Sequence, residues 1–305
     1  MAAPLRLPAA LVLLVAAAAA PAAQVAVWGG GDAAARETAA LVEAALRTGG
    51  HEPVADAPGT VRAGAAAYVV LGRDALAGIA TLPPALPVVA GLVPRADAEA
   101  VVARLPPPRR HRLWIVTTEQ PPARILRLAA LALPEARHVG VLLGPRSGAA
   151  RAAVEAAARA LGRVPRIGLV PDAGALIPVL DELLPEVSVL ALLPDPVVVN
   201  RVGIRPLLLR AYRAGVPVVG PSRALVRAGA VAGVFSGPEE MAGELAALVE
   251  AALAGKAPDP GPRPPRRFDV VVNPYVAHAL GLTLPGAPVL ARELRELEER
   301  EVGAL

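Results

Sequence analysis

Ser188-Val-Leu-Ala-Leu-Leu-Pro-Asp195 and Val216-Pro-Val-Val-Gly-Pro-Ser222 contain the first two of three short apolar runs that decide the fold of this chain. The third run covers residues 231–236. The predicted helices between and after these runs cover residues 200–214, a short segment ending at Gly229, and residues 238–255. Short apolar runs that stop at turn residues and alternate with helices are typical of a parallel sheet buried on both faces.

In such a sheet, ligands bind at the carboxyl ends of the strands. Asp195 and Asn200 follow the first of the three runs, and Pro221 and Ser222 follow the second. We therefore expect these four residues on a common rim, within reach of a bound molecule.

The rest of the chain repeats the same alternation of strands and helices. The predicted strands outside the deciding stretch cover residues 25–28, 51–55, 67–71, 87–91, 112–116, 138–143, 166–170 and 268–273. Helical segments separate them, and prolines make residues 257–267 an extended linker. The sequence therefore predicts an α/β protein with open parallel sheets and right-handed crossovers.

Composition excludes several classes of function. The 305 residues include no cysteine, which removes disulfides, thiolate catalysis, cysteine metal sites and the cysteine of a bacterial lipid anchor. The formal net charge is +4, but the arginines are scattered among acids with no aromatic interleaving. A nucleic-acid partner is therefore not expected.

The first 22 residues have the features of a secretory signal. Arg6 supplies a positive charge, residues 9–20 form an apolar core, and Ala20-Pro-Ala22 fits a cleavage site. An uncleaved N-terminal anchor is the alternative. We expect removal of residues 1–22 and export, which in a bacterium with two membranes means the periplasm.

No catalytic or metal-binding set is evident. The four histidines have no paired spacing, and no Gly-x-Ser-x-Gly motif is present, so neither an enzyme nor a metal site is expected. Gly29-x-Gly31-x-x-Ala34, with Glu52 or Asp56 about twenty residues on, fits a dinucleotide-binding fingerprint. A plain tight turn explains these glycines equally, so no cofactor is expected, although a cofactor-binding enzyme stays open as an alternative.

Several blocks of the sequence carry a family resemblance. In chain order they are Leu133–Leu143 with its polar turn, Pro194-Asp195, Gly215–Ser222, Arg227-Ala-Gly-Ala230, Met241-Ala-Gly243, Ala254-Gly-Lys256, Val270–Asn273 and Ala277–Pro285. This ordered set resembles the substrate-binding proteins of ABC transporters that have the type I periplasmic-binding-protein fold. The branch in question includes binders of aromatic or other apolar amino acids.

The resemblance implies two Rossmann-like lobes that are joined by a hinge of three crossings. Lobe 1 would comprise residues 24–116 and 237–262, lobe 2 residues 117–236 and 266–285, and residues 286–305 a charged, solvated C-terminal helix. The hinge would lie near Thr117, Phe235 and Arg267. Hinge closure on a small molecule would then precede delivery to a permease in the inner membrane, and we expect a monomer.

The resemblance also implies ligand contacts from both lobes. The matching positions are Gly30, Gly72, Arg73, Ala75, Ser147, Asp195 and Ser222, to which the strand-end positions of Trp28 and Asn200 add two further candidates. Arg73 replaces a usual threonine, and Ser147 stands where an acid often meets an amino group. These departures favour a more anionic ligand, although Asp195 is retained for a cationic amine. A degenerate lobe pair that binds a protein is a further alternative.

Overall fold

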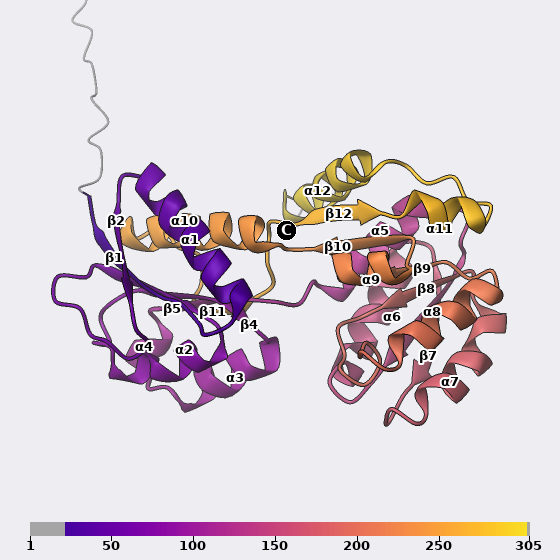
Figure 1. Cartoon of the computed structure of the whole chain (residues 1–305), viewed down its shortest axis with the longest axis horizontal. Helices are drawn as coiled ribbons and strands as arrows, with labels where there is room; N and C mark the ends of the chain where they lie inside the picture. The colour runs from indigo at the N-terminus through magenta and orange to yellow at the C-terminus, as the bar shows by residue number, and fades with distance from the viewer. Residues whose placement is uncertain (1–21, 304–305) are drawn as a thin grey trace, which may run out of the picture.

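The structure, a computed structural model, describes residues 22–303, with side chains described up to residue 301. Two α/β lobes lie next to each other along the long axis of the molecule (Figure 1). The expected signal peptide, residues 1–22, falls almost entirely outside the described residues. Within residues 22–303, no helix has both the length and the apolarity needed to cross a bilayer.

Lobe 1 is built on a six-stranded sheet with the order β11-β5-β4-β3-β1-β2. Its strands are β1 (Gln24–Trp28), β2 (Glu52–Asp56), β3 (Ala67–Leu71), β4 (Val88–Val93), β5 (Leu113–Thr117) and β11 (Gly261–Arg263). All neighbouring strands pair in parallel. The proline-rich linker thus contributes β11, which is tolerated because it lies at the sheet edge.

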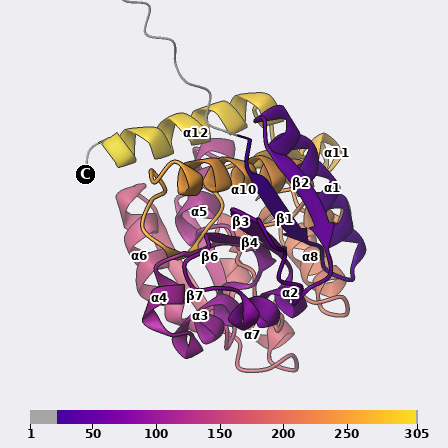
Figure 2. The same cartoon turned by 90° about the vertical axis from the view of Figure 1, so that its left-hand side faces the viewer.

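Helices cover both faces of the lobe 1 sheet, as Figure 2 shows with this lobe toward the viewer. They are α1 (Ala33–Thr48), α2 (Arg73–Ala77), a 3-10 turn (Gly78–Thr81), α3 (Arg95–Arg104), α4 (Pro107–Arg110) and α10 (Pro238–Leu253). Helices α1 and α10 pack against Val25 and Val27 on one face, and α2 and α3 pack against Tyr68 and Val70 on the other. The continuous apolar strands follow from this burial on both faces.

Lobe 2 has a second six-stranded sheet with the order β12-β10-β9-β8-β6-β7. Its strands are β6 (His138–Leu143), β7 (Val164–Leu169), β8 (Val189–Leu192), β9 (Val218–Gly220), β10 (Ala232–Phe235) and β12 (Asp269–Val272). The expectation of a wholly parallel sheet is wrong for β12, which pairs antiparallel with β10. The reason is that β12 enters from the third crossing and runs away from lobe 1 (Figure 1).

The lobe 2 helices also form two layers. They are α5 (Pro122–Ala132), α6 (Arg151–Ala160), α7 (Leu176–Leu183), α8 (Ile204–Arg213), α9 (Arg223–Ala228), α11 (Pro274–Ala279) and α12 (Ala287–Gly303), with 3-10 turns at Gly148–Ala150 and Leu184–Glu186. Helix α12 differs from the solvated helix expected for the tail. Its residues Leu290, Ala291 and Leu294 are buried in the lobe 2 core beside α5.

Three short segments join the lobes. Residues 118–121 follow β5, residues 236–237 join β10 to α10, and residues 264–268 join β11 to β12. Among the described helices and strands, any two that pack extensively against each other belong to the same lobe. The crossings are therefore the main physical link between two separately packed bodies.

Candidate functional site between the lobes

The carboxyl ends of the strands in both lobes lie at the edges that face the crossings. Strands β5 and β10 run directly into crossings, and β1, β3 and β4, like β6, β8 and β9, run parallel to them. This topology places Gly30 and Gly72 at the rim of lobe 1 and Ser147, Asp195 and Ser222 at the rim of lobe 2. Both rims are therefore within the region where a small molecule would meet the two lobes.

Gly30 is required by close packing in the turn after β1. A Cβ at this position would lie 2.9 Å from both the Ala35 Cβ and the Leu71 carbonyl oxygen. Two residues further on, Asp32 caps α1 by accepting a hydrogen bond of 2.7 Å from the Ala35 N–H. Packing therefore explains Gly30 without a bound nucleotide, whereas the fingerprint glycines Gly29 and Gly31 both have room for a Cβ.

The acidic residue of the dinucleotide fingerprint is also engaged within the protein. Asp56 accepts two hydrogen bonds of 2.6 Å from Nε and Nη2 of Arg62. This pair lowers the pKa of Asp56 and holds its carboxylate. The Glu52 side chain, the other acid considered, is exposed at the start of β2. The geometry gives little support to the cofactor-binding alternative.

In the turn after β3, the charged side chain of Arg73 lies between a glycine with positive φ and a buried alanine. Gly72 has a φ of +89°, a conformation that disfavours side chains, and Ala75 is fully buried. Arg73 is exposed, and its Nη2 lies 2.6 Å from Oδ2 of Asp97. The Arg73 guanidinium is therefore a charged group at this rim that is exposed while paired with Asp97.

Trp28 does not present its ring to the space between the lobes. Its exposed fraction is 0%, and its ring meets Tyr68 edge-on with centroids 5.3 Å apart. The end of β1 left two roles open for Trp28, stacking on a ligand or covering the strand end, and its burial does not fit the first. Instead, Trp28 fills the core of lobe 1, where a large aromatic residue buries much apolar area.

Asp195 and Ser147 form a clamp between the loops after β8 and β6. Oδ2 of Asp195 accepts hydrogen bonds from the N–H of Arg146 (3.0 Å), the N–H of Ser147 (2.9 Å) and Oγ of Ser147 (2.9 Å). Its Oδ1 accepts one from the N–H of Val197 (2.8 Å). A Cβ on Gly144 would overlap this carboxylate, which explains the glycine.

This clamp changes the expected role of Asp195. The side chain is 3% exposed and already receives four donors, so most of its acceptor capacity is used inside lobe 2. Only Oδ1, which receives one donor, keeps acceptor capacity for a ligand amine. The negative charge instead holds the two rim loops together.

Asn200 and Ser222 likewise serve the local structure. Asn200 accepts hydrogen bonds from the N–H groups of Val202 (3.0 Å) and Gly203 (2.7 Å), and its Nδ2 donates to Val197. Ser222 caps α9 by accepting from the N–H of Leu225 at 3.1 Å. Both lie at the rim, as expected, Ser222 as the N-cap of α9 and Asn200 in the turn that precedes α8.

Two arginines beside the expected residues were missed. Arg146 is exposed in the turn after β6, and its backbone N–H is held by Asp195. Arg223 follows Ser222 and stacks on the Phe235 ring at 4.7 Å, with Asp269 at 3.9 Å. The only signal in the sequence was adjacency to the turn motifs, since side-chain direction cannot be read from spacing.

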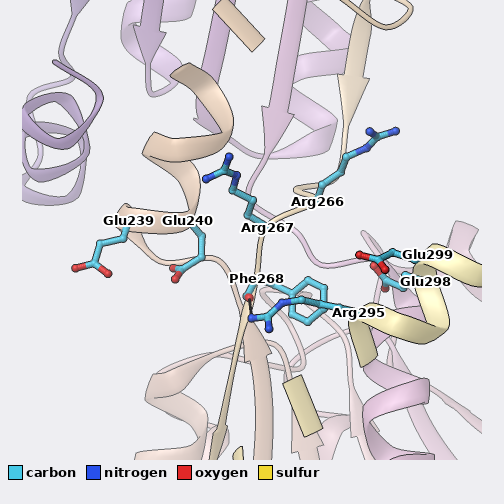
Figure 3. Close-up of a pocket in the computed structure, with 8 residues that line it drawn as sticks. All are labelled: Glu239, Glu240, Arg266, Arg267, Phe268, Arg295, Glu298 and Glu299. Carbon is cyan, nitrogen blue, oxygen red and sulfur yellow. Dashed lines mark hydrogen bonds between the residues drawn. The ribbon is translucent and has the colours of Figure 1, made fainter. Parts of the chain in front are cut away.

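A separate cavity of about 740 Å³ lies at the hinge itself (Figure 3). Its lining is charged and comes from α10, the third crossing and α12: Glu239, Glu240, Arg266, Arg267, Phe268, Arg295, Glu298 and Glu299. Figure 3 shows the α10 and α12 acids on opposite sides of the crossing. Sequence reasoning gave no hint of it, because the three segments are far apart in the chain.

Solved structures with the same fold include substrate-binding proteins. The ligand-free, open structure of a substrate-binding protein with adhesive properties from Clostridium difficile has a TM-score of 0.66 and 15% identity, covering 87% of this chain and 96% of that chain. An ABC domain from Streptococcus pneumoniae in complex with L-Trp has a TM-score of 0.53 and 17% identity, covering 86% and 96%. A conserved domain protein from Vibrio cholerae gives 0.55 and 19%, with the same coverage.

No protein-family model and no curated protein sequence matches the chain. The structural matches establish the type I periplasmic-binding-protein fold that the sequence predicted. At these identities they establish the fold alone, so the ligand and the partner must be argued from this chain.

Proposed function

We propose that this protein is an exported solute-binding protein of an ABC transporter, which closes its two lobes on a small anionic or zwitterionic molecule. The observation that supports this most directly is the architecture: two separately packed α/β lobes, with strand ends facing each other and three short crossings between them.

The charge of the rims supports an anionic group on the ligand. Arg73, Arg146 and Arg223 are exposed at the strand ends, whereas the nearby Asp195 is occupied by donors from its own lobe. Guanidinium groups bind carboxylates and phosphates with paired hydrogen bonds. An amino acid or a related small carboxylate matches this set, and its carboxylate would meet the arginines.

Closure would follow from differential affinity. A molecule that contacts both rims is bound more tightly when the lobes are closed, and the closed population rises by that difference. The crossings would absorb the backbone rotation, as in other hinge motions. We place the protein in the periplasm, where the closed form would deliver its cargo to a permease of the inner membrane.

The test is native mass spectrometry of the mature protein purified from its own host, followed by thermal unfolding with the released compound and a panel of amino acids. A ligand at one hundred times its Kd adds about 2.7 kcal/mol of stability. Arg146→Gln and Arg223→Gln should reduce that gain, and Arg159→Gln, which removes an exposed arginine paired with Glu155 on α6, should not.

The absence of any co-purified molecule and of any thermal shift would contradict the proposal. In that case the alternative is a lobe pair that binds a protein. The specific observation in its favour is that Asp195, Asn200 and Ser222 are all used in internal hydrogen bonds. Addition of a nicotinamide dinucleotide to the same assay tests the cofactor alternative directly.

A further inference from the structure

One buried arginine connects most parts of the hinge. Arg124, in the first turn of α5, is 4% exposed. Its Nε and Nη2 donate to the two carboxylate oxygens of Glu298 at 2.7 and 2.6 Å. Its Nη1 donates to Oε1 of Gln120 and to the carbonyl oxygen of Pro265, both at 2.7 Å. Arg124 thus contacts the first crossing, the third crossing and α12 at once.

The third crossing is held from both lobes at adjacent residues. Pro265 is bonded to Arg124 of lobe 2, while the N–H groups of Arg266 and Arg267 donate to Oε2 of Glu244 at 2.7 and 2.9 Å. Glu244 belongs to α10 of lobe 1 and is buried. Anchors from the two lobes therefore alternate along this crossing between β11 of lobe 1 and β12 of lobe 2, so that the crossing is tied to both lobes.

The second crossing is bonded to the other two. Nε2 of Gln120 donates to Oγ of Ser236 at 2.9 Å, and Oγ of Ser236 donates to the carbonyl oxygen of Arg267 at 2.6 Å. A continuous chain of hydrogen bonds therefore runs from Arg124 through Gln120 and Ser236 to Arg267. All three crossings belong to one network.

Helix α12 supplies the charge that makes this network stable. A buried guanidinium is costly unless an anion pairs with it, and the paired hydrogen bonds from Glu298 satisfy that need. Leu290 and Leu294 pack α12 onto lobe 2 and so fix the position of Glu298. Phe268 completes the site, since the Arg124 guanidinium lies 4.3 Å from the centre of its ring.

Space for relative motion lies directly beside the network. The cavity of about 740 Å³ is lined by Glu239 and Glu240 of lobe 1 and by Arg295 and Glu299 of α12, with the third crossing between them (Figure 3). The first turn of α10 can therefore approach or leave α12 without displacing packed side chains. The rigid network and the open space beside it are the two features that a defined hinge needs.

We propose that the C-terminal helix α12 is a working part of the hinge. Glu298 neutralises and orients Arg124, and Arg124 holds the three crossings as one pivot, so that the lobes move about a single axis. In this role Glu298 and Arg124 are positioning residues that do not touch a ligand. The inference stands on the hinge contacts alone and does not depend on which molecule binds between the lobes.

The test measures the distance between the lobes directly. Because the chain has no cysteine, Ala100→Cys on α3 and Ala152→Cys on α6 give one spin-labelled pair across the two lobes. Double electron–electron resonance on the ligand-free protein then reports the distribution of that distance. Glu298→Gln removes the charge next to Arg124. Glu296→Gln is the matched control, because Glu296 on the same helix has only the exposed partners Arg292 and Arg300.

We expect Glu298→Gln to broaden or shift the distance distribution and Glu296→Gln to leave it unchanged. Ser236→Ala, which breaks the chain of hydrogen bonds without touching Arg124 or α12, should broaden it as well and keeps the test valid if Glu298→Gln folds poorly. Far-UV circular dichroism and thermal unfolding distinguish a change in the hinge from a loss of folding. An unchanged distribution in both folded variants, with or without a lower melting temperature, would overturn the proposal and leave α12 as packing for lobe 2.

Discussion

The clamp between Asp195 and Ser147 predicts that Asp195 is needed for the stability of lobe 2 even without a ligand. Asp195→Ala removes the acceptor of three N–H groups and one hydroxyl, and Ser147 is only 8% exposed. Hydrogen bonds to a charged group contribute about 1.5–3 kcal/mol each, and a buried donor left without a partner costs about 1–3 kcal/mol. Bonds in one network are not additive, so we expect a loss of about 3–5 kcal/mol in unfolding free energy.

Urea unfolding followed by two signals measures this loss and locates it. Both tryptophans, Trp28 and Trp114, lie in lobe 1, so their fluorescence reports that lobe, whereas far-UV circular dichroism reports both. If the lobes unfold separately, Asp195→Ala should lower the midpoint of the circular-dichroism transition and leave the fluorescence midpoint in place. Asp172→Ala is the control, because Asp172 accepts two backbone N–H groups in an exposed turn.

A second substitution, at Gly144, tests the same clamp. Gly144→Ala should be strongly destabilising in the wild-type background, because the added Cβ would overlap the Asp195 carboxylate. In the Asp195→Ala background that overlap disappears, so the cost should fall and the double-mutant cycle should show coupling. A loss below about 1 kcal/mol for Asp195→Ala, comparable to a typical surface change, would refute the clamp. It would restore Asp195 as a free carboxylate for a ligand amine.

Three further predictions concern other parts of the molecule. Burial raises the pKa of Glu244, so the native state binds a proton at this carboxyl more readily than the unfolded chain does. The native state therefore loses stability as the pH rises above the ordinary value of 4.5. In urea titrations, the stability of Glu244→Gln relative to wild type should increase as the pH rises above 4.5. Gly30→Ala should destabilise lobe 1 in the fluorescence transition, and Gly31→Ala, whose Cβ would meet open space, should not. Leu294→Ala should cost about 2–5 kcal/mol, against little for the partly exposed Val289→Ala; equal effects would mean that α12 is not docked in solution.

The fold was largely accessible from the sequence, because it depends on local patterns. Apolar runs ending at turn residues marked the parallel strands, and β3 and β6 begin and end where those patterns place them. The antiparallel β12 was not accessible, since strand direction depends on where the third crossing enters lobe 2. An apolar run such as residues 268–273 has the same composition in either direction.

The sequence indicated where the candidate site residues lie better than it indicated what each side chain does. Topology brought Gly30, Gly72, Ser147, Asp195 and Ser222 to the rims, but it cannot tell whether a polar side chain points toward a ligand or toward its own loop. The sequence placed the hinge near Thr117, Phe235 and Arg267, beside the three crossings, but the hydrogen bonds within it could not be predicted. Gln120 is four residues from Arg124, but the other partners of Arg124, Pro265 and Glu298, lie 141 and 174 residues away, so no spacing rule connects them.

Some polar side chains at the rims hold their own loops while others are exposed, and this difference affects how a two-lobed protein can bind a ligand. A ligand that contacts two lobes gains selectivity for the closed state only if each rim keeps its shape while the hinge moves. Asp195, Asn200 and Ser222 give lobe 2 that constancy by tying its loops to the strand ends. Under the proposed function, recognition would then fall to long, exposed side chains such as Arg146. Internal hydrogen bonds at the rim are therefore compatible with binding, because they preserve the surface on which closure depends.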